Sequence, residues 1–452
     1  MKELNNLIYD THEHPRTVKE WVLYAVQMLM AVFVATVLIS TICGTPVDAG
    51  LLGACLGTLT YQVITKFKSP VFISNSGATV SAVIGALLIG TGVDKVGIPD
   101  VNYNFFAVFI GGLIVLAIYA AFSLIIKWRG IDAINKLFPP YIVGPITIVI
   151  GLNLASFIFT YVDLTPLDST DPLQWWGVLI AISVMLVIAV TSHYFKGFLK
   201  TIPFLIGLLF GFIVCLIVEL VSPTSFGIIA EFQEVDQFFA CPEFAFGKWS
   251  SGIETFDLGV LMKIISLFVP VSICALCEHY SDHAVMSNII GHDLTKDPGL
   301  HRTLLADGTA SVIGTIFGGQ PNTSYGESTA MVGFSRVASV KVVSLAAIMM
   351  GLLAFIEPVQ AFIKAVPNCV FGGCAMILYG YIACSGLKTL MRNKVDLENN
   401  KNLIVVSVIL TVGVSGVYLF DSAFAGVSLA MVLGIILNLI LRYRKGITGY
   451  VD

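Results

Sequence analysis

The sequence predicts an all-α polytopic membrane protein with about 14 transmembrane segments, arranged as two inverted repeats of seven. Its composition is the first reason: of 452 residues, 56% are hydrophobic and only 12% are charged, and the mean hydropathy is +0.88. Soluble domains carry about 25% charged residues. The second reason is a series of long apolar runs. The third is a pair of short apolar runs that occupy equivalent places in the two halves of the chain.

The long apolar runs supply the full-length segments. A membrane helix needs about 20 apolar residues to cross the hydrocarbon core. Runs that approach or exceed this length lie at residues 21–42, 46–65, 104–126, 142–161, 174–194, 202–221, 263–291, 303–318, 341–357, 369–387, 402–420 and 424–441.

The two short runs cover residues 78–90 and 328–340. About 13 residues make a helix of roughly 20 Å, too short for a hydrocarbon core of about 30 Å. Each run follows a polar stretch that looks extended, at 69–77 and 319–327. Each is the third segment of its half, and two halves with odd segment counts must insert in opposite senses. This pattern predicts an inverted repeat with a site where the two half-helices meet.

The basic residues support this layout. If the N-terminus is cytoplasmic, only four of the 25 Lys and Arg residues lie in outer loops or at outer helix ends: Lys95, Lys248, Lys263 and Lys364. The other basic residues fall inside, among them Lys136, Arg444 and Lys445. This asymmetry predicts cytoplasmic N- and C-termini. The N-terminal stretch is charged and unlike a signal peptide, and nothing indicates a nucleic-acid partner.

Two carboxylates, Glu278 and Glu327, lie within the apolar regions of the second half. An ionisable group at bilayer depth costs roughly 2–3 kcal/mol, so such groups tend to be functional and to face a cavity. The starts of half-helices expose backbone N–H donors, and the carboxylates accept hydrogen bonds. A small planar ligand with alternating N–H and C=O edges, such as a nucleobase, would satisfy both. Two acids in a low-dielectric cavity also resist joint ionisation, so one holds a proton that symport can use.

Simpler structural roles stay open for these residues. Glu278 could snorkel to the cytoplasmic surface, and Glu327 could stabilise the start of a short helix through its dipole. Turn geometry, packing or interfacial anchoring could explain the flanking glycines and tyrosines: Gly77, Gly326, Tyr325 and Tyr379. No His or Cys tract has metal-ligand spacing, and no nucleophile–base constellation is recognisable. We therefore expect no metal, no cofactor and no enzymatic activity.

Three motifs give the chain a resemblance to a known family. They are EHYSDHAVMSNIIGHDLTKDPGLHR from residue 278, FGGQPNTSYGE from 317 and AVPNCVFGGCAMILYGYIACSGLKTL from 365. Through them the chain resembles the bacterial uracil permeases of the nucleobase/ascorbate transporter (nucleobase:cation symporter-2) family. The resemblance covers about residues 20–445 and is weaker in the N-terminal half. It implies 14 segments in a bacterial inner membrane protein, with half-helices preceded by short strands.

The resemblance also implies a core domain and a gate domain with the substrate between them, each built from two stretches of the chain. The implied divisions are a cytoplasmic tail (1–20), a first core stretch with segments 1–4 (21–130), a first gate stretch with segments 5–7 (131–221), an extracellular loop (222–258), a second core stretch with segments 8–11 (259–358), a second gate stretch with segments 12–14 (359–445) and a cytoplasmic tail (446–452). The role of the 222–258 loop stays open between a lid and a hairpin.

The family's substrate-binding residues map onto positions of this chain. The resemblance assigns substrate contacts to Glu278, to Gly326 and Glu327 with Tyr325 beside them, to Gly77 and to Tyr379.

The chain also departs from the family pattern. The coupling histidine is replaced by Asp282, with His283 one position later, so the proton carrier stays open between Glu278, Asp282 and His283. The third-segment aromatic residue is replaced by glycine, and a serine of the twelfth segment by Ala375. These changes alter side-chain packing against a base, whereas backbone donation would survive.

We therefore expect a proton-coupled uracil importer that works by alternating access. Its expected partners are uracil or a related nucleobase, protons and membrane lipid, with a second copy of the chain as a candidate partner in a homodimer. The nearest alternative is a purine permease for xanthine or urate. The motif from Gln320 to Thr323 reads QPNT, where purine members tend to have Gln-Asn-x-Gly, which favours the pyrimidine. An anion carrier is disfavoured because buried acids repel anions.

Overall fold

The computed structural model describes residues 7–93, 96–98, 101–130, 139–161, 172–221, 226–233, 235, 237–415 and 426–442. The predictions for Lys95, Lys136, Arg444 and Lys445 lie outside the described residues, as does the tail 446–452.

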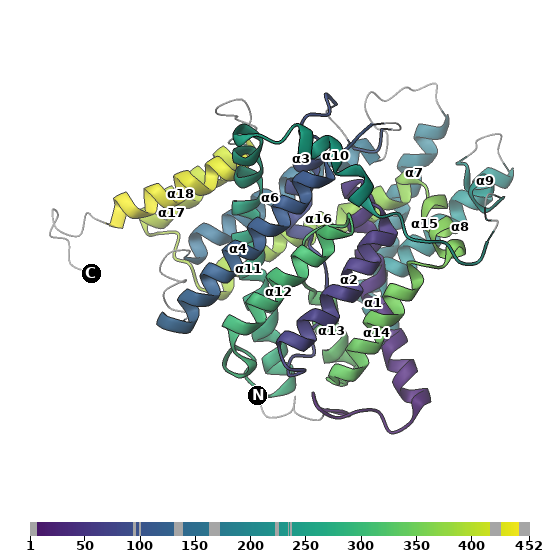
Figure 1. Cartoon of the computed structure of the whole chain (residues 1–452), viewed down its shortest axis with the longest axis horizontal. Coiled ribbons are helices and arrows are strands. Elements are labelled where there is room, and N and C mark those ends of the chain that lie inside the picture. The colour runs from purple at the N-terminus through teal and green to yellow at the C-terminus, as the bar shows by residue number, and fades with distance from the viewer. Residues whose placement is uncertain are drawn as a thin grey trace.

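Helices account for most of the described chain (Figure 1). Among the described residues, 7 helices are long and apolar enough to cross a membrane. They are α1 (Val18–Cys43), α2 (Val47–Ile64), α4 (Phe105–Arg129), α7 (Pro172–Tyr194), α8 (Pro203–Val221), α11 (Leu258–Ile290) and α16 (Asn368–Arg392). The other helices of the two halves are α3 (Val80–Leu87), α6 (Pro140–Tyr161), α12 (Leu300–Ile316), α13 (Gly326–Ser335), α14 (Val340–Leu353), α17 (Asn400–Val414) and α18 (Gly426–Arg442).

Both half-helices are present but shorter than the apolar runs suggest. The first begins with a 3₁₀ turn, η1 (Gly77–Thr79), and continues as α3 to Leu87. The second, α13, ends at Ser335 because Arg336 takes a left-handed conformation with φ 57°. The next residues then pair with the N-terminal segment, where Tyr9 bridges Val337. The pairing with the N-terminal segment therefore limits the length of α13, and hydrophobic periodicity does not predict such pairing.

The segment between α8 and α11 is irregular where the structure describes it. It contains α9 (Ile228–Gln233), η3 (Ala245–Lys248) and α10 (Ser250–Glu254). Its middle pairs with the end of α14: the Ala240 N–H donates to the Phe355 carbonyl (3.1 Å) and the Glu357 N–H to the Phe238 carbonyl (3.1 Å). The span expected at 341–357 therefore ends at Leu353, and the separate amphipathic helix α15 (Glu357–Ala365) follows.

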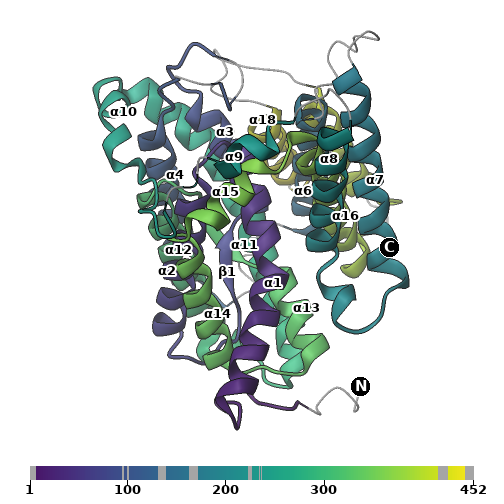
Figure 2. The same ribbon diagram turned by 90° about the vertical axis from the view of Figure 1, so that its right-hand side faces the viewer.

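The helices form two packed groups. The first contains α1, α2, α4, α11, α12 and α14, and the second contains α6, α7, α8, α16, α17 and α18. Figure 2 shows the first group beside the bundle of α6, α7, α8 and α16. Helix α11 contacts α6 and α18, and α1 contacts α8 and α16, so the groups meet along α1 and α11.

Small residues let the helices of the first group approach closely. A Cβ at Gly53 of α2 would lie 2.9 Å from the Gly314 Cα of α12. Small residues at such contacts are how membrane helices pack without a hydrophobic driving force. The strands at 73–75 and 322–324 both contact this pair of helices.

Candidate functional site

The centre of the first group holds a two-stranded sheet. Strands β1 (Ile73–Asn75) and β2 (Asn322–Ser324) pair antiparallel, with Ile73 opposite Ser324 and Asn75 opposite Asn322. Every residue of both strands is buried. Extended backbone at this depth is tolerated because the pairing and the surrounding helices satisfy its polar groups.

The facing asparagines anchor the sheet to the helices. The Asn75 amide donates to the Thr36 carbonyl (3.1 Å) and to Ser40 Oγ (2.8 Å) on α1. The Asn322 amide donates to the carbonyls of Gly53 (2.9 Å) on α2 and Ala310 (3.0 Å) on α12. These bonds fix where each half-helix begins, because Gly77 and Gly326 each follow their strand by two residues.

Neither half-helix has a side-chain cap. Ser76 and Tyr325 occupy the N-cap positions, and neither side chain bonds a backbone N–H of the first turn. Because the strands are antiparallel, the two helices run away from opposite ends of the sheet. Gly326 is exposed and Gly77 is half-buried. Both helix starts can therefore offer backbone N–H donors and a partial positive charge to a ligand.

Three carboxylates surround the start of α13. Glu278 and Asp282 lie one turn apart on α11, Glu327 lies in the first turn of α13, and all three are half-buried. The carboxylates of Glu278 and Glu327 interact electrostatically, and Asp282 interacts with both. Ser324 Oγ donates to Asp282 Oδ2 (3.0 Å), and a methyl group at Gly326 would lie 3.8 Å from Asp282 Oδ1. The structure thus brings together residues that the sequence separates by nearly fifty positions.

His283 lies away from these carboxylates, in a fully buried position. Its Nε2 is 2.6 Å from the Tyr61 hydroxyl and its Nδ1 is 2.7 Å from the His279 carbonyl. Tyr61 in turn contacts Ser69 Oγ (2.8 Å). A carbonyl can only accept, so a neutral ring with its proton on Nδ1 satisfies both contacts. The prediction that Glu278, Asp282 or His283 carries a proton stays a prediction, but only the two acids adjoin Gly326 and Glu327.

Asp307 is a fully buried acid, which the sequence did not lead us to expect. Its Oδ2 lies 2.7 Å from His279 Nδ1, and both side chains are fully buried. The contact departs from straight hydrogen-bond geometry. Thr303 Oγ1 lies 3.1 Å from the other ring nitrogen, and Thr323 Oγ1 donates to Asp307 Oδ2 at 3.4 Å. A carboxylate inside the apolar run 303–318 was the available signal, by the same reasoning that identified Glu278.

The two tyrosines named from the sequence are buried in different places. Tyr325 occupies the N-cap position of α13 without a capping side-chain bond, and its backbone N–H donates to the Phe72 carbonyl (3.1 Å). Tyr379 lies on α16 of the second group and is 1% exposed. Gly77 faces α1 and α16, where the side chains of Ile39 and Ile382 lie. The residues assigned by resemblance therefore come from both helix groups.

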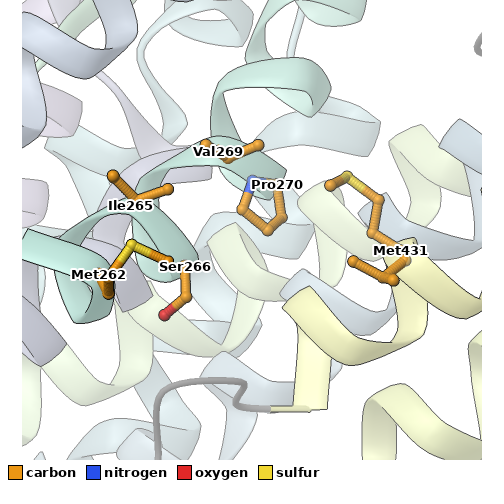
Figure 3. Close-up of a pocket in the computed structure, with 7 residues that line it drawn as sticks. Met262, Ile265, Ser266, Val269, Pro270 and Met431 are labelled. Carbon is orange, nitrogen blue, oxygen red and sulfur yellow. The ribbon is translucent and has the colours of Figure 1, made fainter. Parts of the chain in front are cut away.

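A separate cavity of about 110 Å³ lies between α11 and α18 (Figure 3). Its lining is apolar apart from Ser266 and includes Met262, Val269, Pro270 and Met431. Pro270 precedes Glu278 by eight residues, or roughly 12 Å along a helix. This cavity offers almost no hydrogen-bond partners, so a polar ligand is better served by the acids and helix starts. Among the described residues, no cluster of His, Cys, Asp and Glu has the geometry to hold a metal.

The chain is similar to known permeases over most of its length. Residues 19–422 match the model of a permease family that includes xanthine and uracil permeases. The uracil permease of Bacillus subtilis (strain 168) is 34% identical over 437 residues, covering 94% of this chain and 93% of that protein. The uracil permease of Escherichia coli (strain K12) is 34% identical over 421 residues, covering 92% and 90%.

Solved structures show the fold. The transmembrane domain of the cyanobacterial bicarbonate transporter BicA aligns with a TM-score of 0.61 at 14% identity, covering 95% of this chain and 99% of that one. Murine Slc26a9, an anion transporter solved in the inward-facing state, aligns with a TM-score of 0.63 at 12% identity, covering 96% and 69%. The protein is an integral membrane protein with several apolar spans and this transporter fold. The match over nearly the whole chain means that it belongs to the xanthine and uracil permease family and is a membrane nucleobase permease, not an enzyme.

Proposed function

We propose that the protein imports uracil by proton symport. The observation that carries this proposal is the convergence of Glu278, Asp282 and Glu327 on the uncapped start of α13. A pyrimidine base presents N–H groups that carboxylates accept and carbonyls to which backbone amides donate. In this scheme Glu278 and Glu327 accept from the ring, and the amides near Gly77 and Gly326 donate to it.

The same acids supply the proton. Three carboxylates in one low-dielectric site cannot all be ionised without strong mutual repulsion. Binding a neutral base between them changes the free energy of holding a proton there, which couples the two events. In this scheme Glu278 and Asp282 carry the proton, because they lie on the face of α11 that adjoins the start of α13.

We further propose that the chain forms two inverted repeats of seven segments. The order helix–helix–strand–short helix–helix occurs twice, from α1 to α4 and from α11 to α14. The antiparallel pairing of β1 with β2 supports an inverted relation between these halves. In this proposal the first helix group is the core, the second is the gate, and their relative movement gives alternating access with both termini cytoplasmic.

Two alternative functions differ from this proposal in the substrate that is transported. A purine permease would share the fold and the acids, and uracil permeases among the relatives favour the pyrimidine. An anion carrier would share the fold of BicA and Slc26a9, but three carboxylates around the site repel an anion. A competition panel of pyrimidines, purines and inorganic anions against uracil uptake in a transport-deficient host distinguishes all three.

Substitution of the acids tests the site directly. We expect Glu278→Gln and Glu327→Gln each to abolish uptake of labelled uracil, because an amide cannot accept in the same way or carry the proton. Glu398→Gln is the matched control, since Glu398 is exposed on the loop between α16 and α17. Membrane levels of all variants should equal that of the parent. Normal uptake by both site variants would refute the proposed site.

A further inference from the structure

The surroundings of Gly77, at the start of the first half-helix, are apolar. Among the described residues, the only atoms that a Cβ at Gly77 would meet within 4 Å are Ile382 Cδ1 (3.5 Å) and Ile39 Cδ1 (3.8 Å). Neither neighbour is polar. The start of the first half-helix therefore has methyl groups at its side.

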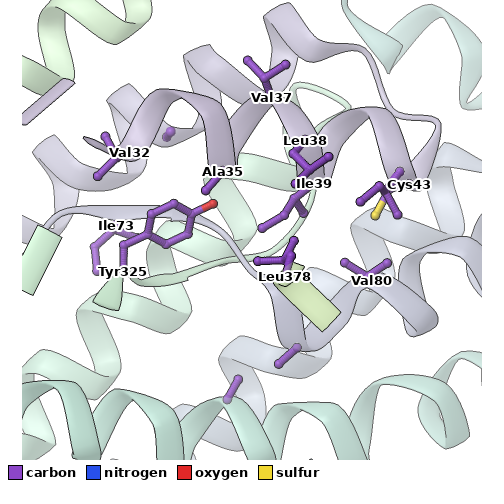
Figure 4. Packing of buried hydrophobic residues seen from close by; sticks show 14 of the residues in the cluster. Val32, Ala35, Val37, Leu38, Ile39, Cys43, Ile73, Val80, Tyr325 and Leu378 are labelled. Carbon is purple, nitrogen blue, oxygen red and sulfur yellow. The ribbon is translucent and has the colours of Figure 1, made fainter. Parts of the chain in front are cut away.

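The two isoleucines come from different helix groups. Ile39 lies on α1 and is 3% exposed, whereas Ile382 lies on α16 and is half-buried. Leu378, one turn before Ile382, is also buried, and Figure 4 shows it in the cluster with Ile39 and Val80 of α3. Ile382 thus extends the apolar side of α16 from this closed cluster to the side of Gly77.

This arrangement matches the one edge of a pyrimidine that lacks hydrogen-bonding groups. Uracil carries N–H and C=O groups around its ring except at C5 and C6, which bear only hydrogen. Burying a carbonyl against methyl groups forfeits a hydrogen bond, whereas burying a C–H edge there is favourable. The acids and uncapped amides are then left for the polar edges.

Resting on the proposed function, we infer that Ile382 is a specificity-determining residue, which limits the size of the group that a substrate carries at C5 or C6. Because residue 77 is glycine, it has no side chain of its own, and the Ile382 side chain lies beside the start of the half-helix. The position of Ile382 therefore limits the size of the group that fits there. A larger substituent on the ring would need the space that the Ile382 Cδ1 methyl occupies.

The experiment measures a selectivity ratio. Inhibition of labelled-uracil uptake by 5-methyluracil and 6-methyluracil is compared with inhibition by unlabelled uracil in each variant. Ile382→Ala should improve the inhibition by one methylated base relative to uracil, by roughly tenfold, the usual scale for one methyl group in an apolar pocket. Ile377→Ala is the matched control: it removes the same atoms from the same helix, but five residues earlier, and it does not adjoin Gly77.

Gly77→Ala supplies the opposite change. Its backbone is not in the left-handed region, and a contact of 3.5 Å with Ile382 is ordinary van der Waals distance, so the fold should accept it. The added methyl group occupies part of the space beside Ile382. It should therefore weaken the inhibition by the methylated bases relative to the inhibition by uracil. The double variant Gly77→Ala, Ile382→Ala should return toward the parent, because the two changes act on one space. If Ile382→Ala fails to reach the membrane, Ile382→Val makes the same comparison with a smaller change.

The results separate this inference from the proposed function. Equal ratios in the parent, Ile382→Ala and Ile377→Ala would overturn the role of Ile382 while uracil uptake stood. A parent that does not take up uracil would instead overturn the proposed function. The ratio would then be measured with the base that the parent does transport, together with its C-methyl derivatives.

Discussion

Two faces of helix α11 both carry titratable residues, but they differ in burial and in the residues that they contact. Glu278 and Asp282 are one turn apart and half-buried beside the start of α13, and Ser324 donates to Asp282. His279 and His283, one position later in each case, are fully buried and contact Asp307 and Tyr61. One residue rotates a helix by about 100°. That rotation moves a titratable group from an accessible site into a closed polar network, which indicates that the two faces serve different purposes.

The buried face connects helices. His279 joins α11 to α12 through Asp307, and His283 joins α11 to α2 through Tyr61. The two imidazole rings lie with centroids 4.0 Å apart. Because these contacts hold α11 against its neighbours, they fix the direction in which Glu278 and Asp282 project. The buried face therefore positions the acids, which the proposed function assigns to binding.

The largest expected effect is the loss of stability on breaking the buried pair of His279 and Asp307. Asp307→Ala leaves His279 without its carboxylate partner, and removing one member of a buried pair costs about 3–5 kcal/mol. We expect a much lower thermal unfolding midpoint for the detergent-purified protein and a lower membrane level. The double variant His279→Phe, Asp307→Leu should recover part of the stability, because it leaves no buried charge or imidazole nitrogen unpaired, although Thr323 loses its acceptor. Equal losses in both variants would argue against the pairing.

An intermediate effect should separate Asp282 from its neighbour. Asp282→Asn and His283→Gln both replace a titratable group by an amide. We expect Asp282→Asn to flatten the pH dependence of uracil uptake, because it removes a proton-binding group from the site. His283→Gln should retain the parent's pH profile while lowering the unfolding midpoint, since the bond to Tyr61 is perturbed. A flattened profile in His283→Gln alone would reverse the assignment of the two faces.

The smallest effect concerns an ion pair outside the spanning helices. Lys68 Nζ donates to both Asp297 oxygens (2.7 and 2.8 Å), and this bond holds the pKa of the Asp297 carboxyl below its usual value. A carboxyl with a lowered folded-state pKa stabilises the protein above its unfolded-state pKa of about 4, and that contribution is lost as pH falls further.

Lys68→Met should therefore lower the unfolding midpoint slightly at neutral pH and low salt. The difference from the parent should disappear at high salt, because exposed pairs are screened, and it should shrink progressively as pH falls below about 4. Lys388→Met, which changes an exposed lysine on α16, is the control. A difference that persists under acid conditions would mean that Lys68 acts through something other than the Asp297 carboxylate.

Much of the fold could be predicted because the bilayer imposes lengths. The short runs at 78–90 and 328–340 predicted both half-helices from apolar length alone. Glu278 and Glu327 stood out as charges within apolar sequence, and the proposed site is built on them. The ends of the half-helices could not be predicted in this way. The hydrophobic pattern does not predict that Val337 pairs with Tyr9, or that Arg336 adopts a left-handed conformation.

The sequence by itself determined that the chain lies in the membrane, where its apolar segments are interrupted, and which acids lie within apolar sequence. Only the tertiary structure decided which of those acids lie together. It placed Asp282 beside Gly326 and His283 beside Tyr61, and it brought Ile382 of one helix group against Gly77 of the other. The physical reason is that spacing along a helix fixes angles between side chains, whereas the helix's rotation and its neighbours are set by packing over the whole molecule.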